Sequence, residues 1–276
     1  MGISKRLAIT SLALLSTGSL AACSNSTETS DQTTQETQVK TVTVATAGDI
    51  KPFAYEENGE LTGYDIEVIK AADEFLNDYE FTFKTTAWES IFVGMDSGKF
   101  QAAANNLSYT EERAAKYLYS LPIAKNPLVL VVASDSSITS LDDIGGKTTQ
   151  DDTGTSTAKL VDDWNAKHTD NPSVINYSGE DVSKRLNDLS NGEFDYLVFD
   201  KISVETIVNQ KGYDLKIIEL DTDSNPNNYI VFSDDSQELQ EQFNLAIQNL
   251  YQNGTLEKLS QAYLGGSYLP DKSELD

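Results

Sequence analysis

The sequence predicts an α/β protein, built from short apolar strands that alternate with amphipathic helices. Three observations predict this fold class: the alternation itself, its restart after residue 130, and a length of 276 residues, which is enough for two lobes of ordinary size. Because strands and helices alternate strictly, we also expect a mostly parallel sheet.

The first run of elements begins near Val42. Val42 and Val44 alternate with threonines in residues 41–47, which is the pattern of a strand. Residues 63–78 have apolar side chains at helical spacing, namely Ile66, Ile69, Ala72, Phe75 and Leu76. The pattern then predicts a strand at 81–84, a helix at 88–98 ending at Gly98, and a strand at 99–105.

The second run repeats this order and ends in a long surface helix. Its expected elements are strands at 128–132, 194–199 and 214–220, a helical turn at 140–146, and helices at 156–167, 180–192 and 201–212. In the second of these helices Val182, Leu186 and Leu189 share one face. The final helix stops at Gly254 and carries the stripe Leu239, Phe243, Ile247, Leu250 and Tyr251.

The N-terminal 22 residues are interpreted as an export signal, because Lys5 and Arg6 precede a short, mildly apolar stretch. Leu20–Cys23 resembles the lipobox of bacterial lipoproteins, whose cysteine is lipidated, for example with palmitate, and becomes the mature N-terminus. The alternative is an ordinary signal peptide with a chance cysteine. Cys23 is the only cysteine of the chain, so it has no disulfide partner.

The following residues, 23–40, are polar and lack aromatic side chains, so we expect a flexible tether, although a polar capping strand would also fit. Together with a lipidated Cys23, this tether predicts attachment to the extracellular face of the cell membrane, in a Gram-positive bacterium.

Composition excludes several classes of function. With 44 acidic and 20 basic residues, the net charge of −24 argues against a nucleic-acid partner. The single histidine, His168, lies in a polar stretch, and no nucleophile, base and orienting group can be assembled. No histidine or cysteine spacing indicates a metal site, so we expect no cofactor and no enzyme activity.

Four stretches of the chain, at residues 44–72, 87–120, 142–160 and 253–265, together resemble successive motifs of the family 3 bacterial solute-binding proteins, which serve amino-acid ABC importers. The resemblance implies a two-lobed periplasmic-binding-protein-like clamp of type II, with two crossover strands as its hinge. It places the crossings near Leu128 to Val132 and near Asn225 to Val231. The lobes would then be residues 41–130 plus 228–276, and residues 131–227.

The resemblance also implies a function. The protein would act as a monomer that captures a free, zwitterionic amino acid between its lobes and delivers it to a membrane permease. The alternatives are a sensing or signalling protein and, on the same fold, a dehydratase-like enzyme.

In this family an arginine in a Ser/Thr-x-Thr-x-x-Arg pattern binds the ligand carboxylate. Residues 108–113, SYTEER, match the pattern at Ser108, Thr110 and Arg113. The planar guanidinium suits a carboxylate because it donates two parallel hydrogen bonds. The alternative is a surface arginine that pairs with Glu111 or Glu112.

The resemblance places the ammonium-binding aspartate at Asp200, directly after an apolar strand. Ligands of open α/β sheets bind beyond the carboxyl ends of strands, which agrees with this position. Aspartate is also a preferred N-cap, and the two roles can coexist.

Further ligand contacts are implied at both lobes. Thr155 and Ser156 begin a helix whose backbone N–H groups would give the carboxylate a second contact, although a plain capping motif looks the same. Trp88 matches a position that packs on the ligand side chain, and Tyr55 would close the other side of the ligand, unless these aromatic residues belong to the core. Asn106 matches a position near the ligand ammonium, where its amide is bulkier than the usual small residue.

One departure from the family concerns the identity of the ligand. Period-2 alternation should turn Asp151 or Asp152 toward the cleft, and alignment favours Asp152. An extra carboxylate there would suit a second cationic group. Residues 105–120 also look most like the cystine and polar amino-acid branch of the family, so we expect cystine or a basic amino acid. Alternatively, both aspartates are solvated or cap the following helix.

Overall fold

The computed structural model describes residues 39–220 and 226–275, and the statements below concern these residues. The export signal, Cys23 and nearly all of the proposed tether lie outside the described residues. The description begins just before the first strand, which starts at Lys40.

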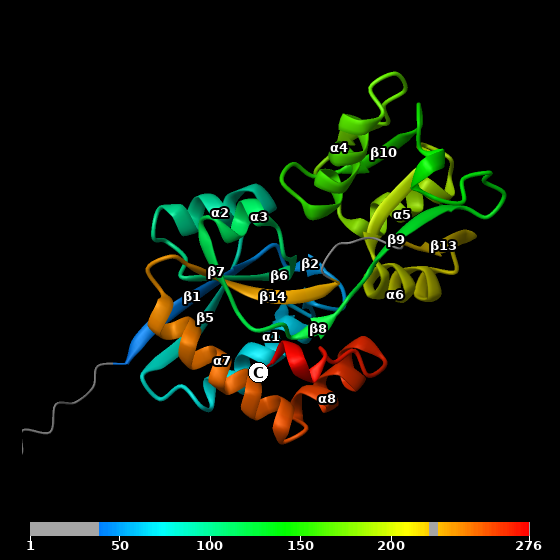
Figure 1. Cartoon of the computed structure of the whole chain (residues 1–276). Helices are drawn as coiled ribbons and strands as arrows, with labels where there is room; N and C mark the ends of the chain where they lie inside the picture. Colours follow the sequence, from blue (N-terminus) through cyan, green and yellow to red (C-terminus); the bar gives the residue numbers. More distant parts are fainter. Residues whose placement is uncertain (1–38, 221–225, 276) are drawn as a thin grey trace, which may run out of the picture. The chain divides into compact units, whose positions relative to one another are not determined.

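The first lobe is built on a six-stranded sheet in the order β5-β1-β6-β14-β7, with β8 paired to β14 (Figure 1). Its strands are β1 (Lys40–Thr46), β5 (Tyr79–Thr85), β6 (Ala102–Ser108), β7 (Tyr117–Tyr119), β8 (Ala124–Lys125) and β14 (Asn227–Ser233). Strand β1 runs parallel to β5 and β6, whereas β14 runs antiparallel to β6, β7 and β8. The sheet is thus completed by a strand that arrives late in the sequence.

Helices cover both faces of this sheet, because side chains alternate along its strands. Val44 and Ala104 pack with α1 (Tyr64–Asp73) and α7 (Gln237–Gln252), whereas Ala45 and Ala103 pack with α2 (Trp88–Asp96). Figure 1 shows α1 and α7 on one side of the sheet and α2 on the other. The remaining helical elements are α3 (Glu111–Ala114), α8 (Thr255–Leu259), a π turn η2 (Ser260–Leu264) and a 3-10 turn η3 (Lys272–Glu274).

A small antiparallel sheet precedes α1 and was not expected from the sequence. It consists of β2 (Asp49–Ile50), β3 (Ala54–Glu57) and β4 (Glu60–Thr62). Its strands are too short to show a clear hydrophobic period, which explains why the pattern missed them.

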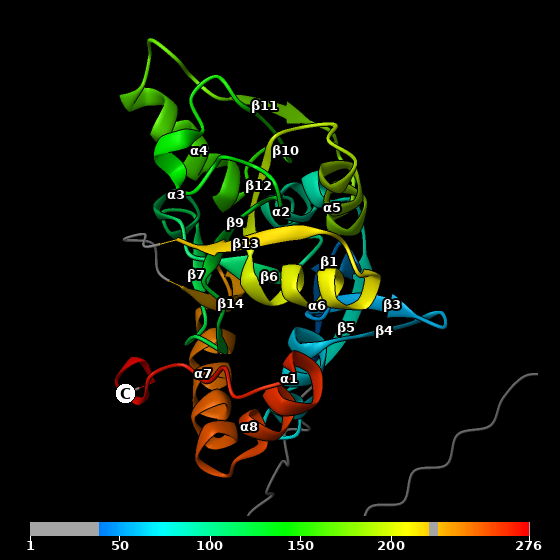
Figure 2. The same ribbon diagram turned by 90° about the vertical axis from the view of Figure 1, so that its right-hand side faces the viewer.

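The second lobe contains a three-stranded sheet in the order β12-β9-β13 and a parallel pair, β10 and β11 (Figure 2). Its elements are β9 (Leu128–Ala133), η1 (Leu141–Asp143), β10 (Thr148–Asp151), α4 (Ser156–Lys167), β11 (Val174–Tyr177), α5 (Val182–Ser190), β12 (Tyr196–Asp200), α6 (Lys201–Lys211) and β13 (Leu215–Glu219). Side chains that alternate along β9 again pack into two separate hydrophobic cores. Val129 and Val131 pack with α5 and α6, while Leu130 and Val132 pack with α4.

Two expectations from the sequence need correction. The sheets are not mostly parallel. Strand β9 is antiparallel to both of its neighbours, β12 and β13, and β14 is antiparallel to β6, β7 and β8. These two strands carry the chain into the second lobe and back, so they run against the strands of the βα units. Phe75 is also not part of a buried helix face, because α1 ends at Asp73 and the Phe75 side chain is 43% exposed.

The change from one sheet to the other lies close to the expected crossings. Residues Leu128–Val132, where the first crossing was expected, pair along their length with strands of the second lobe, whereas Lys125 still pairs with the first sheet. On the return, β13 ends at Glu219 and β14 begins at Asn227. We therefore place the first crossing a few residues earlier, and the lobe limits given above remain a proposal.

Candidate ligand-binding site

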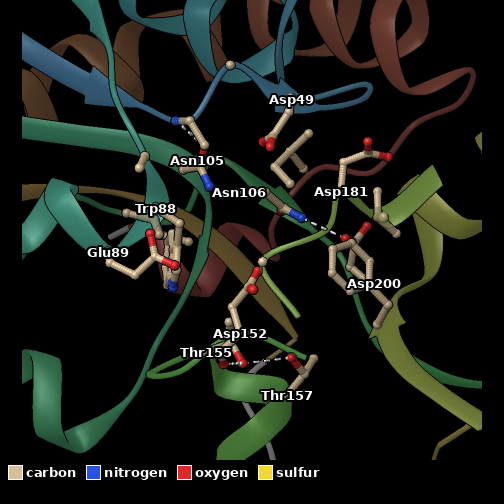
Figure 3. A pocket seen from close by; sticks show the side chains of 18 of the residues that line it. Asp49, Trp88, Glu89, Asn105, Asn106, Asp152, Thr155, Thr157, Asp181 and Asp200 are labelled. Carbon is tan, nitrogen blue, oxygen red and sulfur yellow. Dashed lines mark hydrogen bonds between the residues drawn. The ribbon is translucent and has the colours of Figure 1, made fainter. Parts of the chain in front are cut away.

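A cavity of about 560 Å³ is lined by residues of both lobes. Eight of the nine predicted ligand contacts line it: Trp88, Asn106, Ser108, Arg113, Asp152, Thr155, Ser156 and Asp200. Its volume falls within the range of about 300–1,000 Å³ that is common for small-molecule sites. Figure 3 shows how several of these side chains surround it.

Arg113 is held in place by its own short helix. The hydroxyl oxygen of Thr110 accepts from the Arg113 backbone N–H at 3.2 Å and caps α3. The side chain is 8% exposed, and burial lowers the pKa of its guanidinium. Nη1 donates to the Ser108 carbonyl at 3.2 Å and Nη2 to the Gly154 carbonyl at 2.7 Å.

In the part of the chain that the structure describes, the Arg113 guanidinium has no carboxylate partner. The ion pairs among the described residues do not include Arg113, and both Glu111 and Glu112 are exposed. The alternative of a surface arginine paired with these glutamates is therefore wrong. A buried cation without a counter-charge is costly, so this position favours an anionic ligand group.

Asp200 ends β12 on the opposite lobe and caps the next helix. Its Oδ1 accepts from the Ser203 backbone N–H at 2.8 Å, which confirms the capping role. Its Oδ2 accepts from Asn106 Nδ2 at 2.8 Å (Figure 3). The residue is 6% exposed, and burial raises the pKa of its carboxyl. Among the described residues no lysine or arginine pairs with it, so a cationic ligand group can still bind there.

Asn106 connects Asp200 to a buried carboxyl that the sequence did not single out. Its backbone, at a left-handed φ of 51°, donates from N to Asp65 Oδ2 at 2.7 Å. Asp65 Oδ1 accepts from Asn228 Nδ2 at 2.7 Å, and Asn106 Oδ1 accepts from Asn126 Nδ2 at 3.0 Å. Burial, and to a smaller degree the charge of Asp200, raise the pKa of Asp65 to about 7.

The turn before α4 meets the first lobe through its carbonyl groups. Trp88 Nε1 donates to the Thr153 carbonyl at 3.0 Å, next to the contact of Arg113 with Gly154. Thr155 caps α4 by accepting from the Ala158 N–H at 3.0 Å, as a plain capping motif would. Ser156 follows as the first residue of the helix.

Tyr55 is the predicted contact that does not line the cavity. Neighbouring side chains of a strand point to opposite faces, and on β3 the next residue, Glu56, is the one that lines it. The Tyr55 ring instead lies under Lys51, whose Nζ is 4.5 Å from the ring centroid.

Asp152 lines the cavity, but its carboxylate already has a partner. Oδ2 lies 2.6 Å from Arg185 Nη2, while the buried Asp151 behind it has Oδ1 3.5 Å from Arg185 Nη1. The expectation that Asp152 offers an uncompensated charge to a second cation is therefore not supported by the geometry.

Several lining residues were missed by the sequence analysis: Asp49, Glu56, Glu89, Glu180, Asp181 and Arg185. For Arg185 a signal existed, because Arg113 and Arg185 are the only arginines of the chain after Arg6. The acidic residues gave no such signal in a chain with 44 of them.

Within residues 39–220 and 226–275 no group of three or more His, Cys, Asp or Glu side chains could hold a metal ion. In the same residues none of the helices has both the length and the apolar character needed to cross a membrane.

The two lobes, with a cavity between them that carries a buried cation on one side and a buried anion on the other, define a two-lobed solute-binding protein. Residues 42–266 match the bacterial extracellular solute-binding proteins, family 3, and the chain belongs to this family. It is the extracellular substrate-binding component of an amino-acid ABC importer, and not an enzyme.

Individual relatives agree with this assignment. The L-cystine-binding protein TcyJ of Bacillus subtilis (strain 168) is 32% identical over 237 residues, which cover 84% of this chain and 86% of TcyJ. A solved structure from work on glutathione import via GshT and the cystine ABC importer TcyBC of Streptococcus mutans is 48% identical, with a TM-score of 0.84 over 86% of this chain and 100% of its own. A putative L-cystine ABC transporter structure from Listeria monocytogenes is 29% identical, with a TM-score of 0.77 over 84% and 99%.

Proposed function

We propose that this protein captures cystine or a closely related amino acid and delivers it to the permease of its importer. The observation that carries the proposal is that Arg113 and Asp200 line one cavity, both buried and both without a charged partner among the described residues. Arg113 binds the ligand α-carboxylate through its planar fork, and Asp200 binds the α-ammonium.

Without a ligand, Arg113 and Asp200 each form a hydrogen bond with a neutral group of the protein. The Gly154 carbonyl accepts from Arg113, and the Asn106 amide donates to Asp200. A ligand carboxylate replaces the carbonyl and an ammonium replaces the amide, because charged partners form hydrogen bonds roughly twice as strong as neutral ones. Ligand contacts to both lobes then favour the closed state over the open one.

The choice of ligand rests on two points. Relatives that are named L-cystine-binding proteins support cystine. Within the cavity, Arg185 compensates the charge of Asp152, so the argument for a basic amino acid loses its main support. Glutathione is the competing candidate, given the work on GshT, since it also carries an α-amino-acid head group.

Calorimetry with the purified protein tests the proposal. The panel contains cystine, reduced and oxidised glutathione, arginine, ornithine, aspartate and glutamate. We expect the tightest binding for cystine, at a dissociation constant of about 1 μM or below, equivalent to about −8 kcal/mol or more negative. Tightest binding of arginine or ornithine would restore the second-cation hypothesis for Asp152, and binding of none of these compounds would refute the proposal.

We further propose that Cys23 is lipidated and that the tether holds a monomeric binding domain at the extracellular face of a Gram-positive cell membrane. The lipobox-like residues Leu20–Cys23 and the polar stretch after them support this. A lipid anchor keeps the binding domain close to its permease.

A further inference from the structure

Arg185 is a buried cation whose hydrogen-bonding capacity is largely unused. Its side chain is 2% exposed, and the residue lines the same cavity as Arg113. Within residues 39–220 and 226–275, its Nε and Nη2 atoms have no hydrogen-bond partner. Nη2 lies 2.6 Å from Asp152 Oδ2, but this ion pair is not aligned as a hydrogen bond. Buried charged donors are rarely left in this state in folded proteins.

The two unpartnered nitrogens have a particular geometry. Nε and Nη2 form one edge of the planar guanidinium, and this edge can hold the two oxygens of a carboxylate through parallel hydrogen bonds. Asp151 Oδ1 lies beside Nη1, and Asp152 Oδ2 lies beside Nη2 of this edge, but among the described residues neither carboxylate forms an aligned hydrogen bond to Nε or Nη2. The edge is therefore suited to an external carboxylate.

Acidic side chains accompany Arg185 at the cavity. Asp181 caps α5, the helix that carries Arg185, and Asp49 comes from β2 of the first lobe. Burial and then the charge of Asp181 raise the pKa of Asp49; the charge of Asp152 raises it further, and the charge of Arg185 lowers it. Figure 3 shows Asp49, Asp152 and Asp181 among the side chains around the cavity. The cavity is therefore lined by a second buried arginine together with further carboxylates, of which Asp49 and Asp181 are exposed whereas Asp200 is buried.

We propose that Arg185, with Asp49 and Asp181, forms a second binding site for an α-amino-acid head group within the same cavity. Arg185 holds the second carboxylate, and the two aspartates hold the second ammonium. The inference rests on the proposed function and narrows its ligand class to molecules with two such head groups joined by a short flexible linker, of which cystine is one. The competing interpretation is that Arg185 serves only as an internal counter-ion of Asp151 and Asp152.

A series of thioethers on one scaffold tests this with the unmodified protein. Cystathionine carries two head groups, S-(3-aminopropyl)cysteine lacks the second carboxylate, and S-(3-carboxypropyl)cysteine lacks the second ammonium. We expect each truncated compound to bind about tenfold or more weakly than cystathionine in calorimetry, since each loses charge-assisted contacts. Equal binding of all three compounds would overturn the second site while leaving the first head-group site intact. Binding of none would overturn the proposed function as well.

The variant Arg185→Lys tests whether this side chain causes the loss of affinity in the truncated compounds. Lysine keeps the positive charge toward Asp151 and Asp152 but removes the bidentate hydrogen-bonding edge of the guanidinium. We expect the affinity ratio between cystathionine and S-(3-aminopropyl)cysteine to shrink to about twofold to threefold. The matched control is Lys184→Gln, since Lys184 is on the same helix, pairs with Asp188 and does not line the cavity. The control should keep the ratio of the unmodified protein. A ratio that Arg185→Lys leaves unchanged, in a variant that still binds cystathionine, would assign Arg185 to the internal counter-ion role.

Discussion

Asn106 Nδ2 donates a hydrogen bond of 2.8 Å to Oδ2 of Asp200, and thereby joins β6 of the first lobe to the end of β12 in the second. The amide stands where the proposed ligand ammonium would bind. With the contacts of Arg113 to Gly154 and of Trp88 to Thr153, it belongs to a set of hydrogen bonds that connect the lobes across the cavity.

Removal of the Arg113 guanidinium should strongly weaken ligand binding. Arg113→Ala leaves the ligand carboxylate in a buried site without its partner, so we expect a loss of about 2–5 kcal/mol in binding free energy. Calorimetry with cystine measures this loss, and a thermal melt confirms that the variant is folded. An affinity within twofold of the unmodified protein would remove Arg113 from the site.

Asp200→Asn separates the two roles of this residue. Asparagine is as good an N-cap as aspartate, so α6 should keep its cap and the melting temperature should change little. The negative charge for the ligand ammonium is lost, and binding should fall at least tenfold. Unchanged binding in a folded variant would mean that another anion holds the ammonium.

The buried Asp65 should make the protein less stable as the pH rises. Its pKa is raised to about 7 in the folded state, above the ordinary value of 3.8, so the folded protein holds this proton where the unfolded chain has lost it. The free energy of unfolding should therefore decrease between about pH 4 and pH 7, by at most about 1.4 kcal/mol for each pH unit from this group.

Urea unfolding at several pH values measures this slope. Asp65→Asn carries no titratable group, so its slope should be shallower than that of the unmodified protein, even if its absolute stability is lower. Asp200 and Asp49, whose pKa values are also raised by burial, act in the same direction in both proteins. If the free energy of unfolding had the same pH dependence in the two proteins, the pKa of Asp65 would not be raised in the folded state.

Trp88 should report ligand binding by fluorescence. Its indole lies at the cavity, with its ring centroid 5.5 Å from the Arg113 guanidinium carbon, whereas the second tryptophan, Trp164, stacks on His168 within the second lobe. We expect a ligand-dependent emission change that Trp88→Phe abolishes and the matched control Trp164→Phe retains. If Trp88→Phe kept the emission change and Trp164→Phe abolished it, the ligand would bind away from Trp88.

Cys23→Ser should release the protein from the membrane. Serine cannot accept the thioether-linked lipid, so the variant should appear in the culture medium, and fractionation with immunoblotting detects it. Export itself should continue, because the apolar stretch before Cys23 is unchanged. A variant that stays with the membrane fraction would refute lipidation as the attachment.

The sequence by itself determined the features that depend on neighbouring residues. The helix periods predicted α4 at the residues where it is found, α6 to within one residue, and the end of α7 to within two residues. Side-chain N-caps at Thr155 and Asp200 mark the starts of α4 and α6, and a long apolar stripe marks α7. The family resemblance of residues 108–113 predicted that Arg113 binds the ligand, which stays a prediction, and the structure shows that Arg113 is buried and that Thr110 caps the start of α3. The capping role of Asp200 was local in the same way.

The tertiary structure alone decided which distant side chains share the cavity. Arg185 meets Asp152 because α5 packs near the end of β10, and no local period predicts that meeting. The direction of β9 and β14 depends on how the chain crosses between the lobes, so alternation of elements could not predict it. Asp65 resembled an ordinary acidic residue in the first turn of a helix, and only its burial against Asn106 and Asn228 raises its pKa. Pairing and desolvation depend on separation in space, which the spacing of residues along a chain does not determine.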